Sequence, residues 1–555
     1  MSRNAWTSLG AFGGYCLVVF LFFGLPIATH PGRVVVGSDF DPEIFIWFFA
    51  WWPHALAHGE NPIVTHAVWA PTGYDLAWAT AIPVLALAFS PLTALAGPVV
   101  TYNVVSILLP ALSAWTAFLL CRYLTKRLWP SVAGGYLFGF STYLLGHEQG
   151  HLNLVAVFLV PLVALVVLRY LDGELGRRRL ALYLGVLLAA QVGISTEILA
   201  TLTFALVTAC AVAFWLVPAR RERLRSLVVP AVGAYGIAAL LAAPLVYYTL
   251  TDFTSGELGP TAEFVADPVN LVVPTPVTAV GGDAAKSISA HFPPNYLEQT
   301  SYIGLPLLAI LVLFFVRRRR DPAGRFLLVS FGIVLLAALG SRLHVLGKGI
   351  VPLPWTAVAR QPVFDNVYTV RLMLYAFLAA SVVVALWAAS GARRWLRIGL
   401  PVLAAVALAP NLGHHHWDEE LDVPAFVAGH DYERCLAPNE NVLAIPYGFM
   451  GNSILWQALS GFRFRLEGGT LGPQRPPFGG TTGVRLDHDD VRPGDGGTVL
   501  QLARQRGVGA ILVDPNDPYS WSSVLAGIGK PTAVGGLLLY RVGHDGVDPA
   551  ACGAH

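Results

Sequence analysis

Three carboxylates, Asp39, Asp41 and Glu43, fall within five residues at the end of the first hydrophobic segment. The aromatic run from Ile44 to Trp52 follows at once, so charge is held at what would be a lipid boundary. Ionisable groups at such a place are costly to desolvate, which indicates a functional site. The alternative is a helix cap, with Asp41 as N-cap, Pro42 at the first helical position and Glu43 in the first turn.

A second group with the potential for chemistry is the run from His147 to His151, which matches H-E-x-x-H. In zinc proteases this pattern supplies two metal ligands and a general base, and it lies on a helix, so that both histidines share a face. Here Gly146 and Gly150 flank the motif where the chain must reverse between two apolar segments. The sequence therefore disfavours a membrane metalloprotease and leaves His147, Glu148 and His151 as candidates for binding a metal or a substrate.

Composition sets the class of protein that must position these residues. The 555 residues are 55% hydrophobic and only 13% charged, and the mean hydropathy is +0.59. The chain is therefore too apolar for a soluble protein, and we expect a polytopic membrane protein. The net charge of +2 gives no reason to expect a nucleic-acid partner.

Eleven apolar segments are long enough to be candidate spans, at 9–28, 99–121, 129–145, 152–170, 180–194, 197–217, 227–250, 301–316, 324–340, 371–391 and 397–411. Five of their connectors are short and basic, and together they hold 18 of the 36 Lys and Arg residues. Short basic loops face the cytoplasm, which predicts eleven transmembrane helices with the N-terminus inside and the C-terminus outside. A further candidate, Ala81 to Ala96, is interrupted by proline, and we expect a re-entrant or interfacial helix there.

This topology predicts two regions. Residues 1–411 form the transmembrane domain, whose first outer loop, 29–98, carries interfacial helices that include Trp47. The pattern of residues 412–555 is typical of buried strands with a helix, which predicts a small extracytoplasmic α/β domain. Cys435 and Cys552 both lie in that oxidising region and are expected to form a disulfide.

The same alternation places scattered polar residues on the outer side. Glu197, Arg360 and Arg371 join the acidic motif and the histidine motif there. A carboxylate that deprotonates an acceptor hydroxyl, with an arginine that holds an anionic leaving group, suits chemistry on a lipid-linked phosphate. As alternatives, Glu197 could be only the first turn of a helix capped by Ser195, and the two arginines could be lipid-headgroup anchors.

In layout, residues 9 to about 411 resemble the GT-C superfamily of integral-membrane glycosyltransferases. The resemblance rests on Asp39-Phe40-Asp41-Pro42-Glu43 after the first span, the aromatic helix behind it, the many spans and the outer C-terminal domain. It implies that an acidic residue of the first outer loop is the catalytic base, which by position is Asp41, with Asp39 as the substitute. It also implies a possible divalent metal, Mg²⁺ or Mn²⁺, on Asp39 and Asp41, whose D-x-D spacing binds metal in some members.

The resemblance therefore implies an inverting glycosyltransferase of the bacterial plasma (inner) membrane, acting in the cell envelope. Its partners would be a polyprenyl-phosphate-linked sugar donor, membrane lipids, and a glycan, lipid or protein acceptor. The expected substrate-binding residues are Glu43, Trp47, His147, Glu148, His151, Glu197, Arg360 and Arg371. The alternative function is a non-enzymatic lipid or polysaccharide flippase or an assembly factor, which would need polar residues through the membrane depth, whereas most segments are apolar at their centres.

Overall fold

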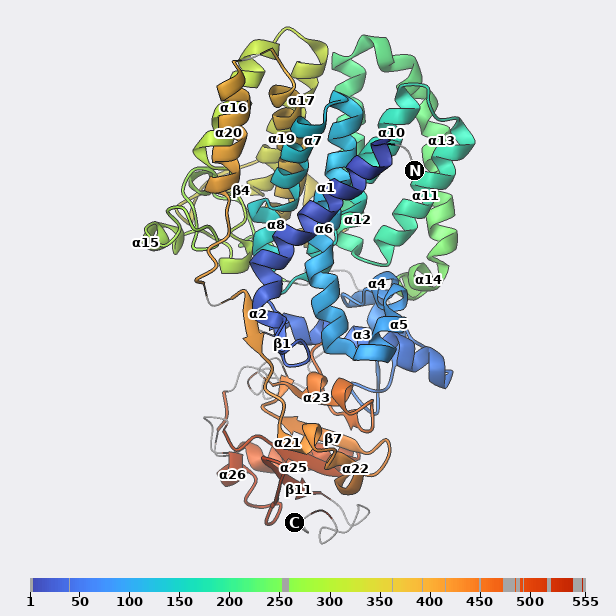
Figure 1. Ribbon diagram of the computed structural model, residues 1–555. Helices are drawn as coiled ribbons and strands as arrows, with labels where there is room; N and C mark the ends of the chain where they lie inside the picture. Colours follow the sequence, from blue (N-terminus) through green and yellow to red (C-terminus); the bar gives the residue numbers. More distant parts are fainter. Residues whose placement is uncertain are drawn as a thin grey trace.

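A computed structural model shows a bundle of long helices at one end of the molecule and a sheet-containing region at the other (Figure 1). The structure describes residues 3–38, 40–251, 259–361, 363–391, 393–414, 416–448, 451–472, 490–492, 494–516 and 521–542, together with Arg485 and Cys552. Asp39 lies outside the described residues.

Each of the eleven apolar segments contains a helix of the bundle. The helices are α1 (Arg3–Val19) with α2 (Leu25–Ile27), α6 (Pro98–Thr125), α7 (Leu128–Gly139), α9 (Leu152–Val155) with α10 (Leu159–Leu171), α11 (Arg177–Val192), α12 (Thr196–Leu216), α13 (Arg221–Leu241) with α14 (Ala243–Thr251), α16 (Leu305–Arg318), α17 (Pro322–Ala338), α19 (Met373–Ala388) and α20 (Arg394–Ala407). Among the described residues, six helical stretches are long and apolar enough to cross a membrane: Ala5–Ile27, Pro98–Thr125, Leu152–Leu171, Thr196–Leu216, Pro218–Leu241 and Thr369–Ala388. The chain therefore has the character of a membrane protein, while eleven crossings stay a prediction.

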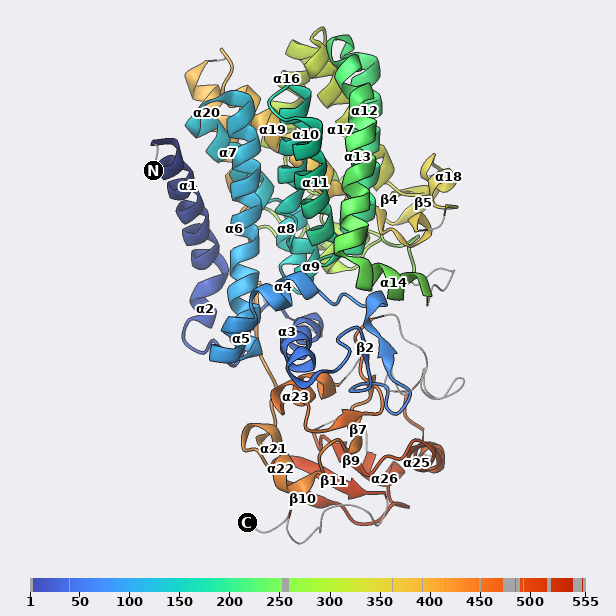
Figure 2. The same ribbon diagram turned by 90° about the vertical axis from the view of Figure 1, so that its right-hand side faces the viewer.

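Contacts between connectors show which helix ends lie together. Arg220, between α12 and α13, pairs with Asp172 after α10 at 2.6 Å. The hydroxyl of Tyr123, near the end of α6, donates to Asp172 and to Glu174. The Arg317 guanidinium lies 4.9 Å above the Trp387 ring, which joins the end of α16 to the end of α19. These basic ends lie away from the C-terminal region (Figures 1 and 2).

The first outer loop contains one long helix and two short ones. Helix α3 (Asp41–His58) lies between the bundle and the C-terminal region, and α4 (Pro83–Ala88) and α5 (Ser90–Ala96) lie beside it (Figure 2). The two short helices have six and seven residues, and at 1.5 Å per residue neither approaches the ~30 Å of a bilayer core. The segment from Ala81 to Ala96 thus makes no helical crossing, as the sequence predicts.

Helix α3 is buried on nearly all sides, which differs from a helix lying in lipid. Trp47 is 0% exposed, and its indole N–H donates to the Gln457 side chain at 2.8 Å. Gln457 belongs to α23 (Ser453–Leu459) of the C-terminal region. The aromatic run therefore packs against protein, because α23 covers the face that the sequence assigned to the membrane interface.

The C-terminal region is built on a five-stranded mixed sheet in the order β10-β11-β9-β7-β8. Its strands are β7 (Asn441–Ile445), β8 (Arg465–Leu466), β9 (Ala510–Val513), β10 (Thr532–Val534) and β11 (Leu537–Arg541). β7 pairs parallel with β8 and β9, whereas β11 runs antiparallel to β9 and β10. The helix α25 (Asp495–Gln505) and the shorter α21 (Ala425–Ala428), α22 (Tyr432–Cys435) and α26 (Trp521–Val524) complete the region. The predicted α/β composition is confirmed.

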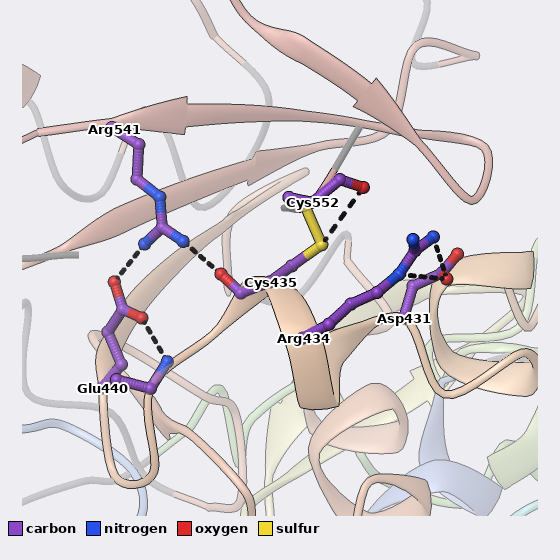
Figure 3. Close-up of a disulfide and its surroundings, with 7 residues drawn as sticks. Asp431, Arg434, Cys435, Glu440, Arg541 and Cys552 are labelled. Atoms are coloured by element: carbon purple, nitrogen blue, oxygen red, sulfur yellow. Dashed lines mark hydrogen bonds and ion pairs between the residues drawn. A yellow bond between two sulfur atoms is a disulfide. The ribbon is translucent and has the colours of Figure 1, made fainter. Parts of the chain in front are cut away.

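The predicted disulfide between Cys435 and Cys552 is present and ties the C-terminal end to α22 (Figure 3). Arg541, in β11, reinforces this corner because its guanidinium pairs with Glu440 at 2.6 Å and donates to the Cys435 carbonyl. The end of the chain is thereby held on the edge of the sheet region.

Three two-stranded sheets lie outside this region. They are β1 (Val34–Val36) with β6 (Asp418–Glu420), β2 (Val64–Thr65) with β3 (Tyr74–Asp75), and β4 (Arg342–Val345) with β5 (Lys348–Pro352). The antiparallel pairing of β1 with β6 joins the segment just before Asp41 to the first strand after residue 411.

Candidate active site

Asp41 is the first residue of α3 and forms an ion pair with His151. Its Oδ2 lies 2.9 Å from His151 Nε2, and the Asp41 side chain keeps 29% of its surface exposed. The N-cap of the helix is Phe40, and no side chain provides a capping hydrogen bond. The predicted N-cap role of Asp41 is therefore wrong by one position, since the carboxylate turns towards the histidine instead of the helix N–H groups.

Close backbone packing brings these two side chains together. Gly37 adopts φ +85°, and a Cβ on it would lie 2.6 Å from the Gln149 carbonyl oxygen. The Ser38 N–H donates to that same carbonyl at 3.0 Å. A Cβ on Gly150 would lie 3.2 Å from the Cβ of Asp41. Both glycines thus allow the segment before α3 to lie directly on the histidine turn.

The H-E-x-x-H motif spans a helix end and a turn. Helix α8 (Thr142–His147) stops at the first histidine, and α9 begins after the second. The predicted chain reversal is confirmed. One helical turn nevertheless remains, because the His151 N–H donates to the His147 carbonyl at 2.8 Å. The two imidazole rings consequently lie 5.4 Å apart, on one side.

Arg371 forms the centre of an ion-pair network beside the histidines. It lies in η7 (Thr369–Leu372), and its Nη1 pairs with Glu197 at 2.5 Å. Its Nε donates to Glu298 Oε1 at 2.9 Å, and Nη2 pairs with the same oxygen. The Glu298 Oε2 lies 3.2 Å from His147 Nε2. One arginine therefore connects α12, the 3-10 turn η5 (Tyr296–Glu298) and α8.

The electrostatics of this network follow from burial and pairing. Burial alone would raise the pKa of Glu298, but Arg371 and His147 hold it well below its usual range. Burial lowers the pKa of His147. For His151, burial also acts to lower the pKa, but the Asp41 carboxylate outweighs it and the pKa is raised. The Arg371 guanidinium thus faces the carboxyl groups of Glu197 and Glu298, while His151 faces the Asp41 carboxylate.

Two further carboxyl groups of the predicted site are buried. Glu148 is 3% exposed, and neither of its oxygens has a hydrogen-bond partner in the described part of the chain. Burial raises its pKa well above the ordinary value, which favours the neutral acid. Glu43 is 6% exposed, and burial raises its pKa as well, with Glu419 and Asp422 adding to the effect. Both groups are buried, whereas the Asp41 carboxylate is partly exposed.

The other predicted residues are placed as follows. Ser195 caps α12 by accepting from the Ile198 N–H, so the capping alternative for the Glu197 segment is confirmed together with the pairing of Glu197 to Arg371. Trp47 is buried against α23 and has no exposed surface. Arg360 is exposed, and within the described ranges no hydrogen bond or ion pair joins it to the cluster.

The sequence places Glu298 on the outer side, in the run Asn295-Tyr296-Leu297-Glu298, but does not include it among the expected site residues. It sits in the long connector between α14 and α16, where no periodicity marks it. Only the neighbouring Asn295, whose side chain accepts from the Glu298 N–H, gives a local signal, since Asn is typical of such caps. With His147 and His151 it forms a group whose ligand atoms all lie within 4.8 Å of one another.

Comparison with known proteins agrees with this architecture. A family model described as "Domain of unknown function (DUF6311)" matches residues 14–409. No curated protein matches the chain. Among solved structures, the chain is similar to the oligosaccharyltransferase AglB from Archaeoglobus fulgidus, solved in complex with an inhibitory peptide and a dolichol-phosphate. The TM-score is 0.50 and the identity is 13%, over 93% of this chain and 70% of that chain.

Two further solved structures are similar to lower or comparable degrees. The apo form of the Archaeoglobus fulgidus oligosaccharyltransferase has a TM-score of 0.51 and 11% identity over 92% of this chain and 70% of that chain. ArnT from Cupriavidus metallidurans, bound to undecaprenyl phosphate, has a TM-score of 0.43 and 13% identity over 98% of this chain and 99% of that chain. The similarity to the apo and peptide-bound oligosaccharyltransferase structures is a similarity of fold, and it confirms the GT-C resemblance expected from the sequence.

Proposed function

The chain belongs to the DUF6311 family of unknown function, and we propose that it is a glycosyltransferase with a polyprenyl-phosphate-linked sugar donor. The observation that carries this proposal is the position of Asp41. A partly exposed carboxylate lies at the junction of bundle and C-terminal region, paired with His151 and next to the Arg371 network. The GT-C fold supports the proposal, since AglB and ArnT were solved with dolichol-phosphate and undecaprenyl phosphate, respectively.

In the proposed reaction Asp41 is the general base. It accepts the proton of an acceptor hydroxyl, whose oxygen attacks the anomeric carbon from the side opposite the phosphate. The bond between that carbon and the phosphate oxygen breaks, and the polyprenyl phosphate or diphosphate leaves. Displacement in one step inverts the anomeric centre. His151 orients the Asp41 carboxylate through the 2.9 Å contact.

Arg371 is the proposed ligand of the donor phosphate, because its planar fork can pair two oxygens at any working pH. In the structure this guanidinium is already paired with Glu197 and Glu298. Its charge becomes available to the donor when one of those carboxylates is engaged elsewhere. Arg360 lies outside this network, and the phosphate proposal rests on Arg371 alone.

A divalent metal fits the residues beside Asp41. His147, His151 and Glu298 offer two nitrogens and one oxygen, and His151 Nδ1 is buried without a partner among the described atoms. Imidazole with carboxylate suits Zn²⁺ or a similar transition metal better than Mg²⁺. A bound cation would supply positive charge near the leaving phosphate. We therefore propose this set in place of the Asp39 and Asp41 pair that the sequence suggests.

Metal binding is expected to depend on His147. Purified protein should contain about one equivalent of metal by elemental analysis, and His147→Ala should lose it, because three protein ligands become two. Chelation should lower glycosyl transfer, with Zn²⁺ or Mn²⁺ restoring it better than Mg²⁺. His54→Ala, at a histidine outside the cluster, is the matched control and should retain the metal. Equal metal content in both variants would contradict this assignment.

The orientation in the membrane is also proposed. With eleven crossings, the N-terminus lies in the cytoplasm and residues 412–555 lie outside the bacterial plasma membrane. The grouping of basic connectors at the end away from the C-terminal region supports this orientation. The division into 1–411 and 412–555 is part of the same proposal.

A reporter test is expected to give opposite signals at two positions. Alkaline phosphatase, which is active only outside the cytoplasm, should be active when fused after Asp422. The same reporter fused after Arg178, in a basic connector, should be inactive. The reverse pattern would put the C-terminal region in the cytoplasm and remove the basis for an outward-facing active site.

The function itself is tested with purified protein in lipid nanodiscs and a panel of radiolabelled polyprenyl-phosphate and polyprenyl-diphosphate sugars. We expect one donor class to release its sugar to an acceptor or to water. If every donor stays intact while labelled lipid crosses the bilayer of reconstituted vesicles, the protein is a flippase and the glycosyltransferase proposal is wrong.

A further inference from the structure

A cavity outside the Asp41 cluster lies between α3 and the C-terminal region. Its volume is about 430 Å³, within the ~300–1,000 Å³ typical of small-molecule sites. Side chains lining it include Trp51, His54, Glu60, Asn61, Phe462 and Arg465. The loop that carries β2 reaches beside the sheet region (Figure 2), and its Val64, His66 and Ala67 belong to the lining of the cavity. The first outer loop thus forms one wall of the cavity, and the C-terminal region forms the other.

This cavity is separate from the Asp41 cluster. Asp41 is the first residue of α3, and His54 lies thirteen positions later on the same helix. At 1.5 Å per residue the two are about 20 Å apart along the helix axis. Nothing in the proposed transfer reaction uses the residues around His54.

Aromatic rings form the inner wall of the cavity. The His54 ring stacks on His58 at 4.1 Å and contacts Phe462 at 4.6 Å. Trp51 meets Phe462 edge to face at 5.2 Å, and its indole N–H is already used by the Pro62 carbonyl. Trp51 is 1% exposed and Phe462 9%, so these two rings form the buried backing of the wall, and of Trp51, His54 and Phe462 only His54 keeps appreciable exposed surface.

The rim carries planar polar groups with free hydrogen-bonding capacity. The side chains of Glu60, Asn439 and Arg465 form no hydrogen bond or ion pair to another residue in the part of the chain that the structure describes. The single carboxylate and the single guanidinium cancel in charge. Burial lowers the pKa of His54, which favours the uncharged ring. The cavity is thus polar at its rim and close to neutral overall.

We propose that this cavity binds a neutral oligosaccharide. Carboxylate, amide and guanidinium groups each offer two coplanar polar atoms, which suit neighbouring hydroxyls of a sugar ring. The partly exposed His54 ring offers an apolar edge to the C–H surface that such a ring also presents. Because the charges of the lining residues cancel, the cavity is not suited to binding a polyanion. This inference rests on the proposed function: the cavity would hold the remote part of a glycan acceptor while the reacting end of that glycan reaches Asp41.

A bound peptide strand fits this cavity less well. β8 is the edge strand of the five-stranded sheet and could in principle accept an added strand. Its edge is already occupied, because the Leu466 N–H donates to the Ala67 carbonyl and the Leu466 carbonyl accepts from the Ala70 N–H. Residues of the first outer loop therefore take the place that a peptide would need.

The test is calorimetric titration of the full chain in nanodiscs with maltohexaose, chitohexaose and mannohexaose, and with hexagalacturonate as the acidic counterpart. We expect at least one neutral hexasaccharide to bind. The double variant Glu60→Ala with Arg465→Ala removes both charged rim groups without changing net charge, and should weaken that binding about tenfold or more. The matched control is Glu433→Ala with Arg463→Ala, two residues of opposite charge outside the cavity lining, and this variant should bind as the wild type.

Each outcome decides the proposal. Binding by no neutral hexasaccharide, binding by hexagalacturonate alone, or equal affinities in the two double variants would overturn it. Asp41→Asn should weaken hexasaccharide binding less than the rim double variant does, which separates the cavity from catalysis. If transfer is seen without hexasaccharide binding, only the cavity inference fails; if binding depends on the rim but no donor is ever used, only the glycosyltransferase proposal fails.

Discussion

Asp41→Asn is expected to lower glycosyl transfer by a factor of about 10² to 10⁴, the usual loss when a general base is removed. Asparagine has nearly the same size and can still form a hydrogen bond with His151, but its amide cannot take a proton from the acceptor. Folding should be little changed, because Asp41 provides no capping bond to α3. Initial rates with a radiolabelled donor, together with donor binding to the variant, measure the effect.

The matched control for this substitution is Asp75→Asn in the same outer loop. Asp75 accepts a hydrogen bond from the Ala77 N–H, a role that asparagine also fills, so activity should be retained. Asp39→Asn is the informative comparison. Near-normal transfer by Asp41→Asn with an inactive Asp39→Asn would move the base to Asp39, and near-normal transfer by both would leave the proposed mechanism without a base.

Arg371→Lys is expected to lower transfer about 10- to 100-fold although the positive charge is kept. Arginine contacts Glu197 and Glu298 at the same time, whereas a lysine ammonium is a single point on a flexible stem and cannot bridge both. Losing one charged hydrogen bond costs about 1.5–3 kcal/mol, which corresponds to this range. Donor KM, kcat and the thermal unfolding temperature together measure the change.

The three measurements separate the roles of Arg371. A raised donor KM supports contact with the phosphate, whereas a lower unfolding temperature with unchanged KM assigns the residue to structure alone. Arg220→Lys is the control, since it alters a half-exposed pair with Asp172 at the far helix ends, where such pairs contribute little. If Arg371→Lys matches Arg220→Lys in all three, Arg371 does not contact the donor phosphate and its proposed role is wrong.

The sequence predicts the bundle and much of the site because both follow from periodic patterns. Hydropathy locates a helix in every expected segment, and charge alternation puts Asp41, His151, Glu197 and Arg371 on one side, where the structure brings them into one cluster. The Pro42 signal gives the start of α3 to within one residue. These predictions depend only on local composition.

What the sequence does not predict depends on contacts between distant segments. Glu298 enters the site because η5 packs against α8, which no local pattern indicates. The aromatic run of α3 is typical of a membrane interface, yet Trp47 finds its partner Gln457 410 positions later in the chain. A buried surface and a lipid-facing surface have the same composition, so only the tertiary structure distinguishes them.

The strand β1 has a consequence for how the protein is made. Its partner β6 is nearly 400 residues further along, and the Gly37 N–H next to it donates to the Trp417 carbonyl. The ribosome therefore finishes the whole bundle before β6 and Trp417 exist, whereas the hydrogen bonds of this segment to Asn103 and Gln149 involve residues made much earlier. The pairing of β1 with β6 is consequently the last of these contacts to become possible during synthesis.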